Sequence, residues 1–238
     1  YCLFALIVFI SKLIFSKYFF VNNSVNNIND FFIIFYNPAK GFAGYLWYIY
    51  VLFEYYLFVP LILLLLNNKI IIALIISIPL SYVSITSYFE IINFNNYLFF
   101  FLLGIFIEKH NDFYINIIDS WKYYFITIFI ILCVSWIFIP INKFIMGISS
   151  IPALHSFVRT FYNTKSLLSI IGYYSFSIYL IHMLVLGLLK AISFKYLYIT
   201  YSNFYIFAFF GTIAGVWLPI IIKKNIINNI PIVGRHIG

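Results

Sequence analysis

The stretch YLWYIYVLFEYYLFVPLILLLL, residues 45–66, decides the fold class of this chain. It is aliphatic or aromatic throughout, apart from the single charged residue Glu54 and one proline. A helix that crosses a bilayer needs about 20 consecutive, mostly apolar residues, and this stretch has that length. We therefore predict a membrane-spanning helix over residues 45–66.

The composition extends this interpretation to the whole chain. Of the 238 residues, 65% are hydrophobic and only 8% are charged, whereas a soluble domain has about 25% charged residues. The excess of apolar side chains must face a second apolar medium, the lipid bilayer. The predicted fold class is an all-α, polytopic bundle of about eight transmembrane helices, in a single domain over residues 1–238. The candidate spans are 1–20, 45–66, 70–88, 92–107, 123–140, 144–162, 167–189 and 202–222.

The distribution of basic residues between these spans predicts an orientation. With the N-terminus inside, the inner segments hold Lys69, Lys109, Lys122, Arg159, Lys165, Lys223, Lys224 and Arg235. The outer segments hold Lys40, Lys143, Lys190 and Lys195. Cytoplasmic segments carry an excess of Lys and Arg, so we expect both termini in the cytoplasm. The net charge of +8 is scattered singly and forms no basic stripe for nucleic acid, and no CxxC pair indicates a thiolate metal site.

Glu54 is the first candidate site residue, because an ionisable group inside a span is costly and is a functional candidate by default. Helical spacing puts Trp47, Tyr50 and Glu54 on one face. In a functional interpretation, the carboxylate lies in a polar cavity and holds a substrate hydroxyl or orients a histidine. In the structural alternative, Glu54 is protonated or hydrogen-bonded between helices.

His182 is the second candidate, in the run GYYSFSIYLIHMLVLG. Ser175, Tyr179 and His182 share a helix face at positions i, i+4 and i+7. This stripe is suited to bind or activate a hydroxyl group. The alternative is a packing stripe, since Ser and Tyr also form hydrogen bonds between membrane helices.

His155 and Arg159 lie four residues apart near the expected cytoplasmic end of span 144–162. The planar guanidinium of Arg159 is suited to bind a phosphate. Equally, the side chain can extend to the lipid headgroups.

Three stretches of the chain resemble one protein family, in the same order along the sequence. They are LWYIYVLFEYYLFVP (Leu46 to Pro60), YLFFFLLGIFI (Tyr97 to Ile107) and IGYYSFSIYLIH (Ile171 to His182), with IPIVG (Ile230 to Gly234) fitting the family's end. The family is acyltransferase 3, the integral-membrane O-acyltransferases of bacteria. The resemblance covers about residues 45–238. Two positions depart from it, since Tyr45 stands where a His often precedes Leu-Trp, and Glu54 stands where Gly or Gln is frequent.

The resemblance implies a fold of ten spans with both termini inside, located in the bacterial cytoplasmic membrane. It implies transfer of an acyl group, usually acetyl, from acyl-CoA to a hydroxyl of a cell-envelope sugar, with no bound cofactor or metal. The family's first span carries an Arg and a His for the chemistry. We therefore expect the first two family helices, and with them the main base, to belong upstream of Tyr1, so that this chain is a fragment.

Within the chain, the resemblance and the polar stripes together predict the site residues. We expect His182 and Glu54 to act catalytically. We expect Trp47, Tyr50, Ser175, Tyr179 and Arg159 to bind substrate. The alternatives are a polysaccharide or lipid-linked sugar exporter of this fold, and a non-catalytic remnant.

Overall fold

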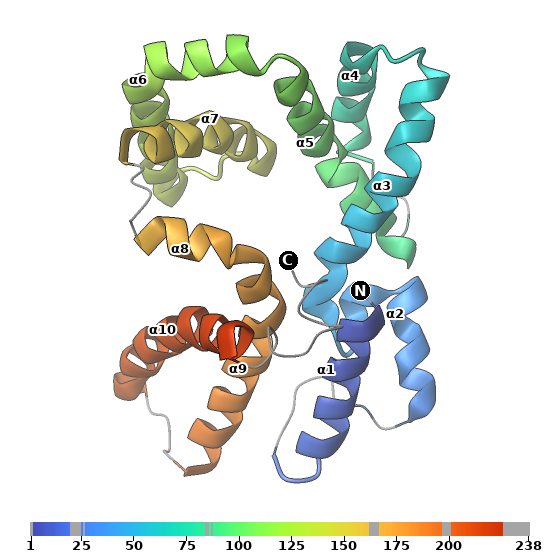
Figure 1. Ribbon diagram of the computed structural model, residues 1–238, viewed down its shortest axis with the longest axis vertical. Helices are drawn as coiled ribbons and strands as arrows, with labels where there is room; N and C mark the ends of the chain where they lie inside the picture. Colours follow the sequence, from blue (N-terminus) through green and yellow to red (C-terminus); the bar gives the residue numbers. More distant parts are fainter. Residues whose placement is uncertain are drawn as a thin grey trace. The chain divides into compact units, whose positions relative to one another are not determined.

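The computed structural model describes residues 2–19, 25, 27–83, 86, 88–161, 167–196 and 201–225 (Figure 1). These residues form helices connected by short turns, and no strand is found among them. The all-α prediction is therefore confirmed. The α-helices are α1 (Cys2–Phe15), α2 (Ile33–Tyr36), α3 (Trp47–Leu65), α4 (Ile70–Leu80), α5 (Ile91–Lys109), α6 (Asn111–Phe138), α7 (Lys143–Phe161), α8 (Leu167–Tyr173), α9 (Ser175–Tyr196) and α10 (Tyr201–Asn225). Four 3-10 turns separate them: η1 (Ile28–Phe32), η2 (Pro38–Lys40), η3 (Gly44–Leu46) and η4 (Tyr88–Glu90).

Some positions used in the sequence predictions lie outside the described residues. One such position is Tyr1, the first residue of the predicted span 1–20. The main base is expected upstream of it. Lys165 and Arg235, which contribute to the predicted orientation, are two others. The expectations that depend on these three residues stay predictions.

Five helical segments in the described part of the chain are long and apolar enough to cross a membrane. They are Gly44–Leu65, Tyr88–Lys109, Asn111–Phe138, Ser175–Ser193 and Phe204–Asn225. Their surfaces are strongly apolar, and Phe138, for example, is 80% exposed. Such exposure is costly in water and favourable in lipid. The chain is therefore a multi-pass membrane protein.

The predicted count of eight spans is not confirmed, because three expected spans do not give long apolar helices. In the described part of the predicted span 1–20, helix α1 (Cys2–Phe15) has 14 residues, and α4 has 11 residues. A helix rises about 1.5 Å per residue, so neither covers a hydrocarbon layer of about 30 Å. Helix α7 has 19 residues but is not apolar enough, since Ser149, Ser150 and His155 interrupt its apolar sequence.

Local sequence explains where several of these helices begin and end. Helix α3 ends before Asn67 and Asn68, which adopt left-handed backbone with φ of 50° and 59°. Asparagine tolerates this conformation better than most residues, and here it turns the chain into α4. Before α5, Phe89 and Glu90 are also left-handed, with φ of 52° and 51°. Such residues are true outliers that cost about 1–3 kcal/mol each and require surrounding contacts to hold them.

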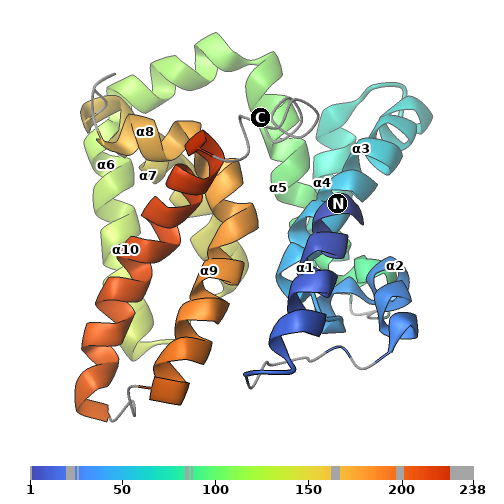
Figure 2. The same ribbon diagram turned by 60° about the horizontal axis from the view of Figure 1, so that its bottom comes forward.

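The chain divides into two compact units, described separately below. The first holds the described residues of 1–57, 84–94 and 170–238, and the second holds those of 58–83 and 95–169. In the first unit, α9 and α10 lie side by side (Figure 2), and Gly211 and Gly215 of α10 lie against Leu186 of α9. Its core joins α1, the turns before α3, and α9. The buried members are Ala5, Val8, Phe9, Val25, Ile34, Phe42, Ala43, Leu46, Leu180, Ile181 and Val185.

The second unit contains the pair α6 and α7, which lie side by side in both views (Figures 1 and 2). Ile118 of α6 and Ala153 and Ser156 of α7 are almost completely buried. Small residues on α7 allow the two backbones to approach closely, as is common between membrane helices. On α7, Gly147 faces the ring of Phe100, where a Cβ atom would lie 2.5 Å from the ring carbon Cζ.

Candidate functional site

The His182 cluster consists of Tyr45, Tyr48, Tyr179 and His182. The Tyr179 hydroxyl on α9 donates a hydrogen bond of 2.6 Å to the backbone carbonyl of Tyr45 in η3. The Tyr179 ring lies edge-on to Tyr48, with centroids 5.8 Å apart, and the His182 ring lies 6.5 Å from that of Tyr45. Two residues of the predicted α9 stripe therefore lie at the entrance to α3. Ser175, the third, begins α9 and is exposed.

The hydrogen bonds of His182 define which of its ring nitrogens carries a proton. Nδ1 lies 2.9 Å from the carbonyl oxygen of Ile178 and 2.7 Å from that of Tyr179. Carbonyl oxygens only accept, so Nδ1 must be the protonated nitrogen in both bonds. In the neutral ring Nε2 then carries a lone pair, and it can accept a hydrogen bond or a proton.

Tyr45 contributes a buried hydroxyl to the same cluster. Its oxygen is shielded from solvent and has no hydrogen-bond partner among the described residues. A buried hydroxyl without a partner is costly and is unusual away from functional sites. The phenol therefore has free capacity to donate to a polar group next to His182.

The Glu54 face is the second group in this unit, and comprises Trp47, Tyr50 and Glu54 on α3. The Tyr50 hydroxyl donates to the carbonyl of Phe35 at 2.8 Å. The Glu54 atom Oε2 is buried and has no hydrogen-bond partner in the part of the chain that the structure describes. Glu90 lies near enough for its charge to act on both Tyr50 and Glu54.

Glu90 belongs to this group, although the sequence analysis did not single it out. Its side chain is 3% exposed. Oε1 accepts a hydrogen bond of 2.8 Å from the backbone N–H of Ala39, and Oε2 accepts one of 2.6 Å from the side-chain amide of Asn93. The chain has only six acidic residues, and the position of Glu90 directly before an apolar span was a usable signal.

Within the described part of the chain, Glu54 and His182 belong to two separate sets of contacts. The contacts of Tyr179 go to Tyr45 and Tyr48, and no hydrogen bond or ring contact found among the described residues joins Glu54 to His182. Tyr48 and Glu54 are six residues apart, which places them about 120° apart around the helix. The predicted roles of both stripes stay predictions, as two neighbouring groups of one unit.

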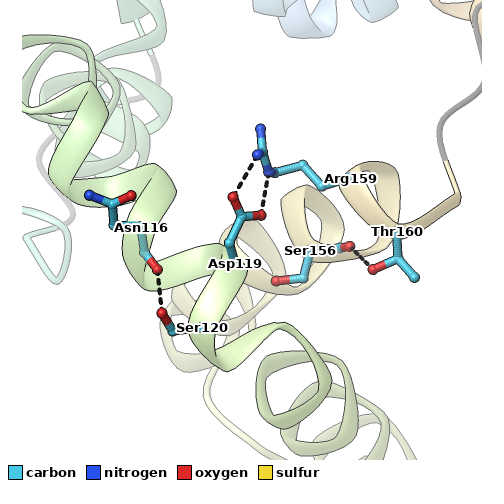
Figure 3. A network of polar contacts seen from close by, with 6 residues as sticks. All are labelled: Asn116, Asp119, Ser120, Ser156, Arg159 and Thr160. Atoms are coloured by element: carbon cyan, nitrogen blue, oxygen red, sulfur yellow. Dashed lines mark hydrogen bonds and ion pairs between the residues drawn. The ribbon is translucent and has the colours of Figure 1, made fainter.

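Arg159, in the second unit, forms a two-pronged ion pair with Asp119 (Figure 3). Its Nε and Nη2 atoms donate to the two carboxylate oxygens of Asp119 at 2.7 and 2.6 Å. Figure 3 shows the guanidinium of Arg159 on α7 pointing to the carboxylate of Asp119 on α6. Both side chains are nearly half exposed. Arg159, which is predicted to bind a phosphate, is therefore paired with Asp119 but still accessible to solvent. A phosphate must either displace Asp119 or bind beside it.

His155 on α7, four residues before Arg159, also contacts a side chain of α6. Its Nδ1 atom lies 2.6 Å from the hydroxyl of Tyr114. Asp119 and Tyr114 were missed by the sequence analysis because residues 108–122 were taken as a connection outside the span 123–140.

Within the described residues, no group of three His, Cys, Asp or Glu side chains is arranged to hold a metal ion.

A comparison with protein families gives the chain its classification. The family model described as "Acyltransferase domain", that of acyltransferase 3, matches residues 1–222. The match begins at Tyr1, well before the residues 45–238 on which the resemblance was based. It ends before Ile230 to Gly234, which also lie outside the described residues. The match does not test whether a base lies upstream of Tyr1, and that expectation stays a prediction.

The other comparisons add no named relative. No curated protein and no solved structure matches the chain significantly. The family match covers most of the chain and agrees with the apolar helices described above. The chain belongs to the acyltransferase 3 family and is a membrane acyltransferase.

Proposed function

We propose that this protein moves an acetyl group from acetyl-CoA to a hydroxyl of a cell-envelope or exported polysaccharide sugar. The acceptor hydroxyl oxygen bonds to the acyl carbon of the thioester, and the carbon–sulfur bond breaks. The hydroxyl proton finally protonates the departing CoA thiolate, so that atoms and charge balance. The membrane is the bacterial cytoplasmic membrane, with both termini on its cytoplasmic face.

The observation that best supports this proposal is the position of His182 Nδ1 within hydrogen-bond distance of two backbone carbonyls. Its Nδ1–H is fixed by two backbone carbonyls, so Nε2 is available as an acceptor. Next to it lies the Tyr45 hydroxyl, which has no hydrogen-bond partner among the described residues. An acceptor at Nε2 orients the attacking hydroxyl, while a phenol donor can stabilise the oxyanion that develops on the acyl carbonyl.

Glu54 and Arg159 have separate roles in this proposal. The buried Oε2 of Glu54, with Trp47 and Tyr50 on the same face, accepts a hydrogen bond from a second hydroxyl of the acceptor. Arg159 meets a phosphate of the acyl-CoA donor, because its guanidinium is exposed and forms two parallel hydrogen bonds to an anion. Ser175, at the start of α9, contributes a further hydroxyl to the acceptor side.

The test compares His182→Ala and His182→Gln in the full-length protein expressed in cells. The carboxamide oxygen of Gln can accept a hydrogen bond but is not a base. We expect His182→Ala to reduce acetyl esters on the surface polymer roughly 10- to 100-fold, the loss for one strong hydrogen bond in the transition state. Partial rescue by Gln indicates orientation of the hydroxyl, whereas no rescue indicates a base.

His110→Ala is the control, because His110 is exposed between α5 and α6. Protein abundance in the membrane fraction is measured for each variant. Normal acetylation in His182→Ala at normal abundance would remove His182 from the site.

The exporter alternative predicts a different result in the same cells. A transporter of the polymer or its lipid-linked precursor would lower the amount of polymer at the surface when inactivated. The proposed acetyltransferase would leave the amount unchanged and remove only the acetyl esters. Measuring total sugar together with ester content therefore distinguishes the two functions.

A further inference from the structure

A small pocket lies in the first unit, apart from the His182 cluster. Its volume is about 140 Å³. Water occupies about 30 Å³ per molecule in the liquid, so the pocket has room for a few water molecules or for one edge of a small ring. We call it the Glu90 pocket; its lining residues are Asn37, Ala39, Lys40, Glu90, Ile92 and Asn93.

The carboxylate of Glu90 is held in this pocket by several independent contacts. Its side chain is only 3% exposed, and each oxygen accepts one hydrogen bond from a neighbouring segment. The left-handed backbone of Phe89 and Glu90 places it there. Strained residues held by surrounding contacts concentrate at binding and active sites. Each carboxylate oxygen can accept two hydrogen bonds, so both retain capacity for a ligand.

The lining indicates the chemical class of the ligand. Lys40 and Glu90 carry opposite charges, so the pocket favours a neutral molecule. Two asparagine amides add both donors and acceptors, while Ile92 offers an apolar contact. A sugar hydroxyl both donates and accepts, and the carbon–hydrogen face of a sugar ring is apolar. One carboxylate next to an ammonium group is a poor site for a metal ion, which prefers several oxygen ligands.

We propose that the Glu90 pocket binds one neutral sugar ring of the acceptor, with Glu90, Asn93 and Lys40 contacting its hydroxyls. This inference rests on the proposed acetyl transfer for its biological meaning. The Glu54 face does not line the pocket but lies within electrostatic reach of Glu90, whose charge acts on Tyr50 and Glu54. Glu54 then serves a neighbouring hydroxyl of the same acceptor.

Binding is tested directly by saturation-transfer NMR with the full-length protein in lipid nanodiscs. The probes are methyl α-D-glucopyranoside, which is neutral, and methyl α-D-glucuronide, which is anionic. We expect transfer to the neutral glycoside and at least a threefold weaker signal from the anionic one. Ile92→Trp fills the pocket without removing a polar group and should abolish the signal. Lys40→Met should reduce it several-fold.

Tyr88→Trp is the matched control, because it places the same indole ring at an exposed position two residues before Glu90. A signal that survives in well-folded Ile92→Trp would overturn the location of the site. Equal signals from both probes would overturn the neutral class, and no signal from either probe would overturn the pocket as a sugar site.

The proposed function and the pocket fail in distinguishable ways. His182→Ala should lose acetylation but keep the NMR signal. Sugar binding without acetylation in any form of the protein would contradict the proposed function and leave the pocket standing. Loss of binding in Ile92→Trp with normal acetylation would show that the pocket is not the acceptor site, while the acetyl transfer would stand.

Discussion

At the scale of single residues, local hydrogen bonds define the chemistry that His182 can perform. The backbone carbonyls of Ile178 and Tyr179 hold the proton on Nδ1. Because both lie on the preceding turn of α9, the helix itself selects the tautomer. The stripe Ser175, Tyr179 and His182 was predicted as functional or as packing. Tyr179 donates a hydrogen bond to the carbonyl of Tyr45, and the role of the stripe stays a prediction.

The ion pair between Arg159 and Asp119 leads to a prediction about donor binding. Asp119 is nearly half exposed, so it can be replaced by alanine without opening a cavity in the core. If a donor phosphate competes with Asp119 for the guanidinium, Asp119→Ala lowers the KM for acetyl-CoA and Arg159→Ala raises it. We expect about threefold to tenfold in each direction, modest because the pair is solvent-accessible. Arg159→Lys keeps the charge but loses the planar fork, so its KM should lie between those of the native protein and Arg159→Ala. Steady-state kinetics in nanodiscs measure these values; equal KM in all variants would assign the pair a purely structural role.

At the scale of elements, short turns rather than long helices position both groups of the first unit. Tyr45 lies in η3, Ala39 in η2 and Glu90 in η4, and each of them precedes or connects to a span. The connection between η2 and η3 depends on Gly44, where a Cβ atom would lie 2.5 Å from the carbonyl oxygen of Ala39. No side chain fits there without moving the backbone that donates to Glu90.

Gly44→Ala adds only one methyl group, but we expect it to disturb the Glu90 pocket, because that methyl group would clash with the backbone of Ala39. Overpacking against backbone costs about 1–3 kcal/mol, and it displaces the Ala39 N–H from Oε1 of Glu90. The thermal unfolding midpoint in detergent should fall, and the methyl glucoside signal should weaken. Gly104→Ala is the control, because a Cβ atom there meets nothing within 4 Å. A native midpoint and native binding in Gly44→Ala would contradict this account of the turn.

At the scale of the whole molecule, the question is which helices cross the bilayer. The five long spans of the described residues are an odd number, so both termini share a face only if an odd number of other segments also cross. The hydroxyl of Tyr55 on α3 donates to the carbonyl of Phe94 on α5 at 2.7 Å. This bond holds the start of α5 beside the middle of α3.

If the predicted span 70–88 crosses the membrane between α3 and α5, Asn67 and His110, which follow α3 and α5, should face the same side. Asn142, beyond the 28-residue helix α6, should face the other side. Each position is replaced by Cys in a background with Cys2→Ser and Cys133→Ser, and labelled with a membrane-impermeant maleimide in cells and in inverted vesicles. Cys133 alone, within α6, serves as the control that reacts only after denaturation. Labelling of Asn67→Cys and His110→Cys from opposite faces would show that residues 70–88 do not return the chain.

The sequence alone determined the membrane environment, the all-α class and the family. Each of these depends on apolar run length or on residue order along one segment, which is local information. The positions of the helical faces with Glu54 and His182 followed in the same way from helical periodicity. The span count did not, because α1 and α4 are short and α7 contains polar side chains within its length.

Only the tertiary structure decided which side chains meet. Arg159 and Asp119 are 40 residues apart, Tyr179 and Tyr45 are 134 apart, and Ala39 and Glu90 are 51 apart. No periodicity within one helix specifies such pairs, because they depend on which helices pack together and in which register. The Glu90 pocket likewise exists only because turns from separate segments converge on one buried carboxylate, and burial makes the loss of either of its hydrogen bonds costly.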